Sequence, residues 1–190
     1  IFLYVFVNYK IIMKFKDIQT KIKLLYLSFM GKIRKNSTPI EISNQNKIVI
    51  KNILIIFPIK EEEFRVAVYA FRNLIKNKDV NYYFIVNGIY KHHFNLSGYV
   101  FDLFYDTKKQ KVRFDETFYE ERIINKKFDM IIDLNCQFNY DISSFINNLE
   151  SYYKIGFKNM YSDYFYNIQI NFNEDDTLEN SYNKINLMLN

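Results

Sequence analysis

The chain is poor in the residues that cross-link, kink or ligate a protein. Its 190 residues include one cysteine, two prolines, four glycines, two histidines and no tryptophan. One cysteine excludes a disulfide within the chain and fits a reducing compartment, so we expect a cytoplasmic protein. The glycines stand alone, so neither G-x-G-x-x-G nor the Walker phosphate-binding pattern occurs, and we expect no cofactor. No stretch reaches the roughly 18 apolar residues that a membrane-spanning helix needs.

The usual metal ligands and nucleophiles are equally sparse. His92 and His93 are adjacent, so their side chains point in different directions, and no cysteine or acidic cluster around them has zinc spacing. We therefore expect a surface turn there and no metal. Cys136 follows a predicted strand and precedes a predicted helix, where a helix amino terminus can activate a thiol. Since no histidine partner is evident, we expect a passive, packed side chain.

Positive charge is concentrated near the amino terminus. Residues 10–35 hold eight lysines and arginines against one aspartate, a charge of +7, which leaves −2 of the net +5 for the rest of the chain. A near-neutral body lacks the basic surface that nucleic-acid binding requires. We therefore expect no nucleic-acid partner.

The basic segment has the pattern of an amphipathic helix. Over residues 13–35, apolar side chains recur at spacings of three and four, with lysines around them: Phe15, Ile18, Ile22, Leu25 and Phe29. Such a helix packs on the domain or projects from it, or it lies on an anionic membrane surface, where each lysine contributes on the order of 1 kcal/mol. If the helix lies on a membrane surface, the protein is peripheral to the inner face of the membrane.

Residues 36–47 have the composition of a linker. The sequence thus indicates an arm and linker over residues 1–47 and a domain over residues 48–190. Met13 is a plausible start, which leaves open whether residues 1–12 are native.

The domain alternates apolar strands with helical patterns. Strands are predicted at 53–57, 80–86, 99–104, 128–134 and 153–157, with a short edge strand at 166–170. Helices are predicted at 61–76, 89–96, 114–126, 141–149 and 177–189. Alternation of this kind predicts a mostly parallel sheet with helices on both faces, a single Rossmann-like three-layer α/β domain.

Two segments carry a resemblance to a known family. Residues 53–74 form a strand, a loop and a helix ending near Arg72, and FDMIIDLN at 128–135 is followed by a helix and then KIGF at 154–157. Together they resemble the amino-terminal domain of glycosyltransferase family 9, the heptosyltransferase-type enzymes of the GT-B fold, over about residues 50–170. That family has a similar opening, a YDLVIDLQ strand and an R-I-G-F strand.

The resemblance implies sugar transfer in bacterial envelope polysaccharide or lipopolysaccharide synthesis. Glu63 falls on the family's aspartate, the general base that deprotonates the acceptor hydroxyl. Glu62 replaces the family's glycine before that aspartate. The Glu63 side chain is longer than aspartate and shifts the reactive oxygen by more than about an ångström, an error that can cost about 100-fold in rate. The alternative is that Glu63 only complements the dipole of its helix.

Four polar residues surround the end of the FDMIIDLN strand: Asp133, Asn135, Gln137 and Asn139. They either bind acceptor hydroxyls or cap the helix that begins near residue 141. The family binds its nucleotide-sugar donor mainly in a second domain, and nothing here resembles that domain. We therefore expect a truncated or degenerate acceptor-side half, inactive as this chain alone, or a non-catalytic stand-alone binding module of the same fold.

Overall fold

The computed structural model describes residues 18–33, 50–74, 79–114, 120–172 and 176–189. The chain divides into two compact units, residues Ile1–Lys35 and Asn36–Asn190. The predicted linker at 36–47 and the first twelve residues lie outside the described residues.

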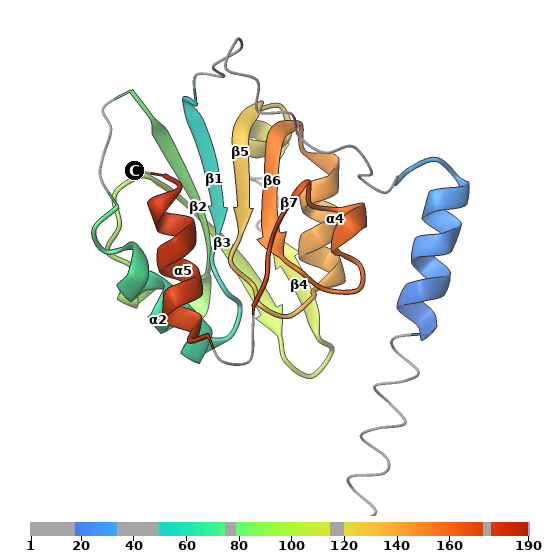
Figure 1. Ribbon diagram of the computed structural model, residues 1–190, viewed down its shortest axis with the longest axis horizontal. Helices are drawn as coiled ribbons and strands as arrows, with labels where there is room; N and C mark the ends of the chain where they lie inside the picture. Colours follow the sequence, from blue (N-terminus) through green and yellow to red (C-terminus); the bar gives the residue numbers. More distant parts are fainter. Residues whose placement is uncertain (1–17, 34–49, 75–78, 115–119, 173–175, 190) are drawn as a thin grey trace, which may run out of the picture. The chain divides into compact units, whose positions relative to one another are not determined.

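The first unit holds a helix over residues 18–29, drawn in blue in Figure 1. Gly31 ends it with a φ of 69°, and the N–H groups of residues 31 and 32 donate to carbonyls of the last turn at 3.0 and 2.9 Å. Glycine adopts this left-handed conformation without strain. The predicted helix over 13–35 is confirmed across its described middle, whereas Phe15 lies outside the described residues. In the described ranges, no helix has both the length and the apolar character needed to cross a bilayer.

The second unit is built on one seven-stranded sheet with the strand order β4-β3-β2-β1-β5-β6-β7. Every neighbouring pair is parallel except β3 and β4. The strands are β1 (Asn52–Ile56), β2 (Asn81–Asn87), β3 (Tyr99–Asp106), β4 (Lys111–Phe114), β5 (Phe128–Asp133), β6 (Ser151–Phe157) and β7 (Ile168–Ile170). Without β4 this is the strand order of the Rossmann fold (Figure 1). From β1 the strands are added toward one edge of the sheet, and from β5 they are added toward the other edge, so the order reverses between β1 and β5. The predicted Rossmann-like α/β domain is confirmed.

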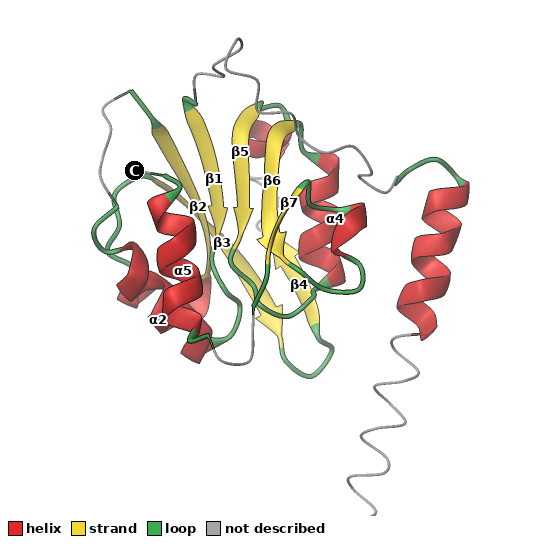
Figure 2. Cartoon of the chain, viewed as in Figure 1, coloured by secondary structure: helices red, strands yellow, loops and turns green. Residues whose placement is uncertain are grey.

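Helices cover both faces of the sheet (Figure 2). Within the described part of this unit, the α-helices are α2 (Glu61–Phe71), α4 (Tyr140–Asn148) and α5 (Leu178–Leu187), and shorter helical turns are η1 (Gly88–His93), η2 (Glu120–Ile124) and η3 (Ser162–Tyr164). α2 connects β1 to β2 toward one edge of the sheet, and α4 connects β5 to β6 toward the other edge. Because both crossovers are right-handed, the two helices lie on opposite faces of the sheet. α5 returns to the face of α2 and packs against it.

The core under α2 and α5 is largely aromatic. Phe57, which follows β1, is fully buried and makes edge contacts with the rings of Phe64, Phe71 and Phe84 at 5.9 to 6.0 Å between centroids. Tyr182 of α5 belongs to the same cluster and is also fully buried. Because aromatic pairs favour such edge-to-face geometry, this cluster fixes how α2 leaves the end of β1.

One predicted helix is wrong at its start. Residues 111–114 form the antiparallel strand β4, and the helical turn η2 is described over Glu120–Ile124. The reversal before β4 is made by Asp106, whose carboxylate accepts the N–H groups of Lys108 and Lys109 at 3.0 Å each. This aspartate-based turn gives β3 a hairpin partner, so the residues that follow continue the sheet. Residues 115–119 lie outside the described residues.

Candidate functional site

The loop after β1 is tied to the ends of two neighbouring strands. The Ile59 N–H donates to Asn135 Oδ1 at 2.9 Å, and the Ile59 carbonyl accepts from Asn87 Nδ2 at 3.2 Å. Asn135 follows β5 and Asn87 ends β2, and both are buried. The carboxyl ends of β1, β2 and β5 are therefore joined at the point where the strand order reverses, the usual ligand position in this fold.

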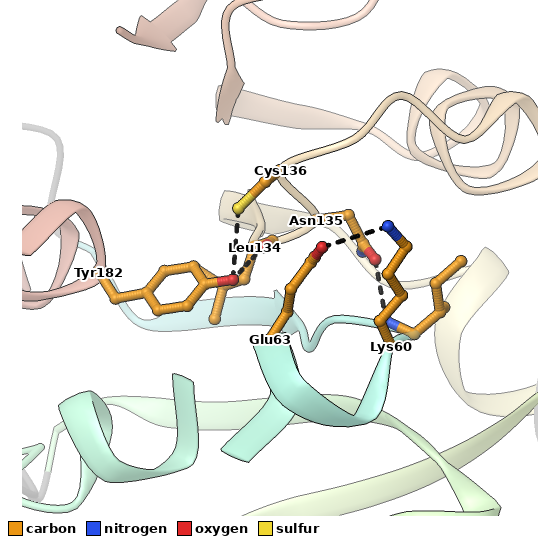
Figure 3. Close-up of polar contacts among 7 residues, drawn as sticks. Lys60, Glu63, Leu134, Asn135, Cys136 and Tyr182 are labelled. Atoms are coloured by element: carbon orange, nitrogen blue, oxygen red, sulfur yellow. Dashed lines mark hydrogen bonds and ion pairs between the residues drawn. The ribbon is translucent and has the colours of Figure 1, made fainter. Parts of the chain in front are cut away.

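Glu63 lies in the first turn of α2, close to this point (Figure 3). Glu61 and Glu62 of the same turn are exposed, whereas the Glu63 side chain is only 16% exposed and its Oε1 lies 3.5 Å from Lys60 Nζ. Figure 3 shows its carboxylate directed toward the segment that follows β5. Any of the three glutamates serves the helix dipole, so the dipole alone does not account for the inward turn of Glu63.

Asp133, at the end of β5, is turned into the protein. It is 3% exposed. Its Oδ1 accepts from the backbone N–H and the Nδ2 of Asn135 at 2.9 and 2.7 Å, and its Oδ2 accepts from the Tyr166 hydroxyl at 2.6 Å. Burial raises the pKa of this carboxyl above its ordinary value, against the lowering effect of these donors. Asp133 and Asn135 thus use their hydrogen bonds to hold the strand end in place.

The other two predicted site residues have different roles. Asn139 caps α4, because its side-chain oxygen accepts from the N–H groups of Asp141 and Ile142 at 3.0 and 3.2 Å. This is the capping role that the sequence left open. Gln137 is exposed on the loop between β5 and α4, so it is the predicted strand-end residue whose amide faces solvent.

Cys136 is a packed thiol. Its Sγ lies 3.5 Å from the Tyr182 hydroxyl, which donates to the Leu134 carbonyl at 2.9 Å (Figure 3). Burial, more than the nearby negative charge of Glu63, raises the pKa of the Cys136 thiol to about 12. The thiol is therefore protonated at neutral pH, which agrees with the passive side chain predicted from the sequence.

The raised pKa predicts slow alkylation. We expect iodoacetamide at pH 8 to modify Cys136 at least about tenfold more slowly in the folded chain than in 6 M urea, because the thiolate is the reacting species. The rate in the folded chain should rise steadily up to pH 10. Mass spectrometry of timed samples measures both rates, and equal rates at pH 8 would contradict this account.

Two site residues were not found from the sequence. Asn87 is the last residue of β2, and Asn135 comes just after β5. In both cases a polar residue follows an apolar run, and this pattern could have indicated Asn87 as a site residue. Lys60 precedes α2 in a row of charged residues, and no local pattern distinguishes its ion pair with Glu63. Among the described residues, no group of three His, Cys, Asp or Glu side chains is arranged to hold a metal ion.

Comparison of this chain with protein-family models, with curated proteins and with solved structures gives no match.

Proposed function

We propose that this domain is the acceptor-side half of a heptosyltransferase-like GT-B glycosyltransferase. The observation that carries the proposal is the meeting of the two segments that resemble the family. They are joined by the bond between Ile59 and Asn135, which lie 76 positions apart, and Glu63 is directed at their junction (Figure 3). The junction lies at the carboxyl ends of parallel strands, where ligands bind in such sheets.

In this proposal Glu63 takes the proton of an acceptor hydroxyl. The hydroxyl oxygen then attacks the anomeric carbon of a nucleotide sugar, and the nucleoside diphosphate leaves. The amino end of α2 stabilises the charged carboxylate before it accepts the proton. Gln137 supplies an exposed amide for acceptor hydroxyls, while Asp133 and Asn135 act as positioning residues for the strand end. A second domain holds the nucleotide-sugar donor.

A non-catalytic binding module is the second candidate, and one contact favours it. Lys60 lies 3.5 Å from the Glu63 carboxylate, so the negative charge already has a partner inside the protein. A general base has to give up part of such an interaction when it accepts a proton. In this alternative the ion pair is retained and a ligand binds at the same junction without transfer.

A depletion experiment tests the proposed function. Extract of the source cells, which supplies any donor domain, is depleted of this protein with an antibody and assayed with a labelled nucleotide-heptose and heptose-deficient lipopolysaccharide. We expect transfer to fall on depletion and to return when purified full chain is added. Transfer that survives depletion, or that added chain does not restore, contradicts the transferase proposal.

We further propose that the arm helix binds an anionic membrane surface from the cytoplasmic side. Four apolar side chains on one side of the helix are exposed: Ile18 (53%), Ile22 (62%), Leu25 (65%) and Phe29 (90%). Lys21 borders that side, because it lies three residues after Ile18 and four before Leu25, and Lys23 follows on an adjacent side of the helix. An apolar stripe bordered by cations is the arrangement that lies in the headgroup region of an anionic bilayer.

Vesicle co-sedimentation tests the arm. We expect the full chain to pellet with vesicles of phosphatidylcholine and phosphatidylserine, and Phe29→Ser to reduce the bound fraction at least about threefold because it removes the most exposed apolar group. Leu187→Ser, at a residue of α5 that is 74% exposed, is the matched control and should bind as the wild type does. Equal pelleting with phosphatidylcholine alone contradicts the requirement for anionic lipid.

A further inference from the structure

A groove of about 350 Å³ lies between α2 and the segment that begins with η1. Its α2 wall is formed by Arg65, by Val68 and Tyr69 three and four residues later, and by the C-cap residue Arg72, so these residues share one side of the helix. The lining residues are Arg65, Val68, Tyr69, Arg72, His93 and Asn95. Its volume is within the range of small-ligand sites. None of these residues belongs to the junction of β1 and β5.

The groove is positively charged, and most of that charge comes from one arginine. None of the six described lining residues is acidic. Arg65 pairs with Glu61 of the preceding turn, which compensates its charge. Arg72, which is exposed, has its guanidinium carbon 3.8 Å from the centre of the Tyr69 ring. The carboxyl end of α2 contributes about half a negative charge, less than the full charge of Arg72.

The stacking of Arg72 on Tyr69 prepares it for an anion. Contact with an aromatic ring favours one position of the guanidinium, whose N–H groups all lie in one plane. Those groups form a fork that matches two oxygens of a phosphate or carboxylate. His93 and Asn95 add hydrogen-bonding side chains from the other wall. A tetrahedral phosphate has oxygens for both walls at once, whereas a planar carboxylate is fully used by the arginine fork.

We propose that this groove binds the phosphate group of a small phosphate monoester. Arg72 holds two phosphate oxygens, and His93 and Asn95 contact the third from the opposite wall. The face of Tyr69 that the guanidinium leaves uncovered borders the organic part of the ligand. This site is separate from the sugar-transfer site and does not depend on Glu63.

The test follows the backbone amides of the full chain by two-dimensional NMR during titration with glucose 6-phosphate. Glucuronate and glucose serve as the carboxylate and neutral probes. We expect saturable shifts confined to residues 65–72 and 93–95, at least tenfold weaker affinity for glucuronate, and no shifts with glucose. Arg72→Gln should weaken glucose 6-phosphate binding at least tenfold, and Asn95→Ala should weaken it to a smaller extent.

Two controls make the outcome decisive. Arg113→Gln removes the same charge from an exposed arginine of β4, and Glu63→Gln alters the proposed transferase site, so both should bind glucose 6-phosphate as the wild type does. The amide spectra also show directly whether each variant is folded. The proposal is overturned by shifts that do not saturate, by shifts elsewhere in the domain, by equal affinity for glucuronate, or by equal losses in Arg72→Gln and Arg113→Gln.

Discussion

Replacing Glu63 by glutamine is expected to lower sugar transfer by about 100-fold or more, the usual contribution of a positioned general base. Glutamine keeps the size of the side chain but cannot take up the proton of the acceptor hydroxyl. The change is made in the full chain and assayed by adding it back to depleted extract. The apparent KM for the acceptor should change little, because the loss falls on the chemical step.

Glu62→Gln is the matched control. Glu62 lies in the same turn of α2 but is exposed, so its replacement makes the same change in charge and in helix dipole energy. We expect full restoration of transfer by this variant. If Glu63→Gln also restores transfer fully, Glu63 is not the base. If both variants lose activity equally, the dipole interpretation of the glutamates is favoured over a catalytic role.

Replacing Tyr166 by phenylalanine is expected to reduce the free energy of unfolding by about 3 kcal/mol, since a buried carboxylate loses its hydrogen-bond donor. The Tyr166 hydroxyl donates to Asp133 Oδ2 at 2.6 Å and lies 3.2 Å from Ser143 Oγ. Urea unfolding followed by circular dichroism measures the change. Tyr152→Phe, at a tyrosine that is 63% exposed, should change stability by less than about 0.5 kcal/mol.

The same network predicts a pH dependence. Burial raises the folded-state pKa of Asp133, so the native state holds this proton more tightly than the unfolded chain does. The contribution of Asp133 to stability is therefore most favourable below the unfolded pKa of about 3.9 and is lost as pH rises through the folded pKa. Asp133→Asn should remove this decline.

A double-mutant cycle isolates the contact. In the Asp133→Asn background, Tyr166→Phe should cost only about 1 kcal/mol, the value of a neutral hydrogen bond. A cost as large as in the wild type would mean that the Tyr166 hydroxyl stabilises the domain through its other neighbour, Ser143 Oγ at 3.2 Å. That outcome would contradict the role given to the carboxylate.

The core of the fold was predictable because its signals are local. The apolar runs at the centre of the sheet are too short for helices and are apolar on both faces, as buried parallel strands are. The strand β4 was not predicted, because its hairpin turn contains no glycine, proline or asparagine. Its reversal depends on the side chain of Asp106 and on Gln110, a non-glycine residue with a φ of 52°.

The site was predictable in position but not in its bonds. A polar cluster at the end of the FDMIIDLN strand is visible in the sequence, and Asn139 stands where a helix cap belongs. The partners of Asp133 and Asn135 lie 33 and 76 positions away, at Tyr166 and Ile59. Contacts over such distances are set by the order of the strands, which local patterns do not determine.

The most direct test of the central claim is to locate a bound acceptor on the domain. The backbone amides of the full chain are followed by NMR during titration with the oligosaccharide released from heptose-deficient lipopolysaccharide. We predict saturable shifts centred on residues 59–63 and 134–137, which meet where β1 and β5 end, with weaker binding after Gln137→Ala. Saturable shifts that leave both segments unchanged would contradict the assignment of this junction as the sugar site.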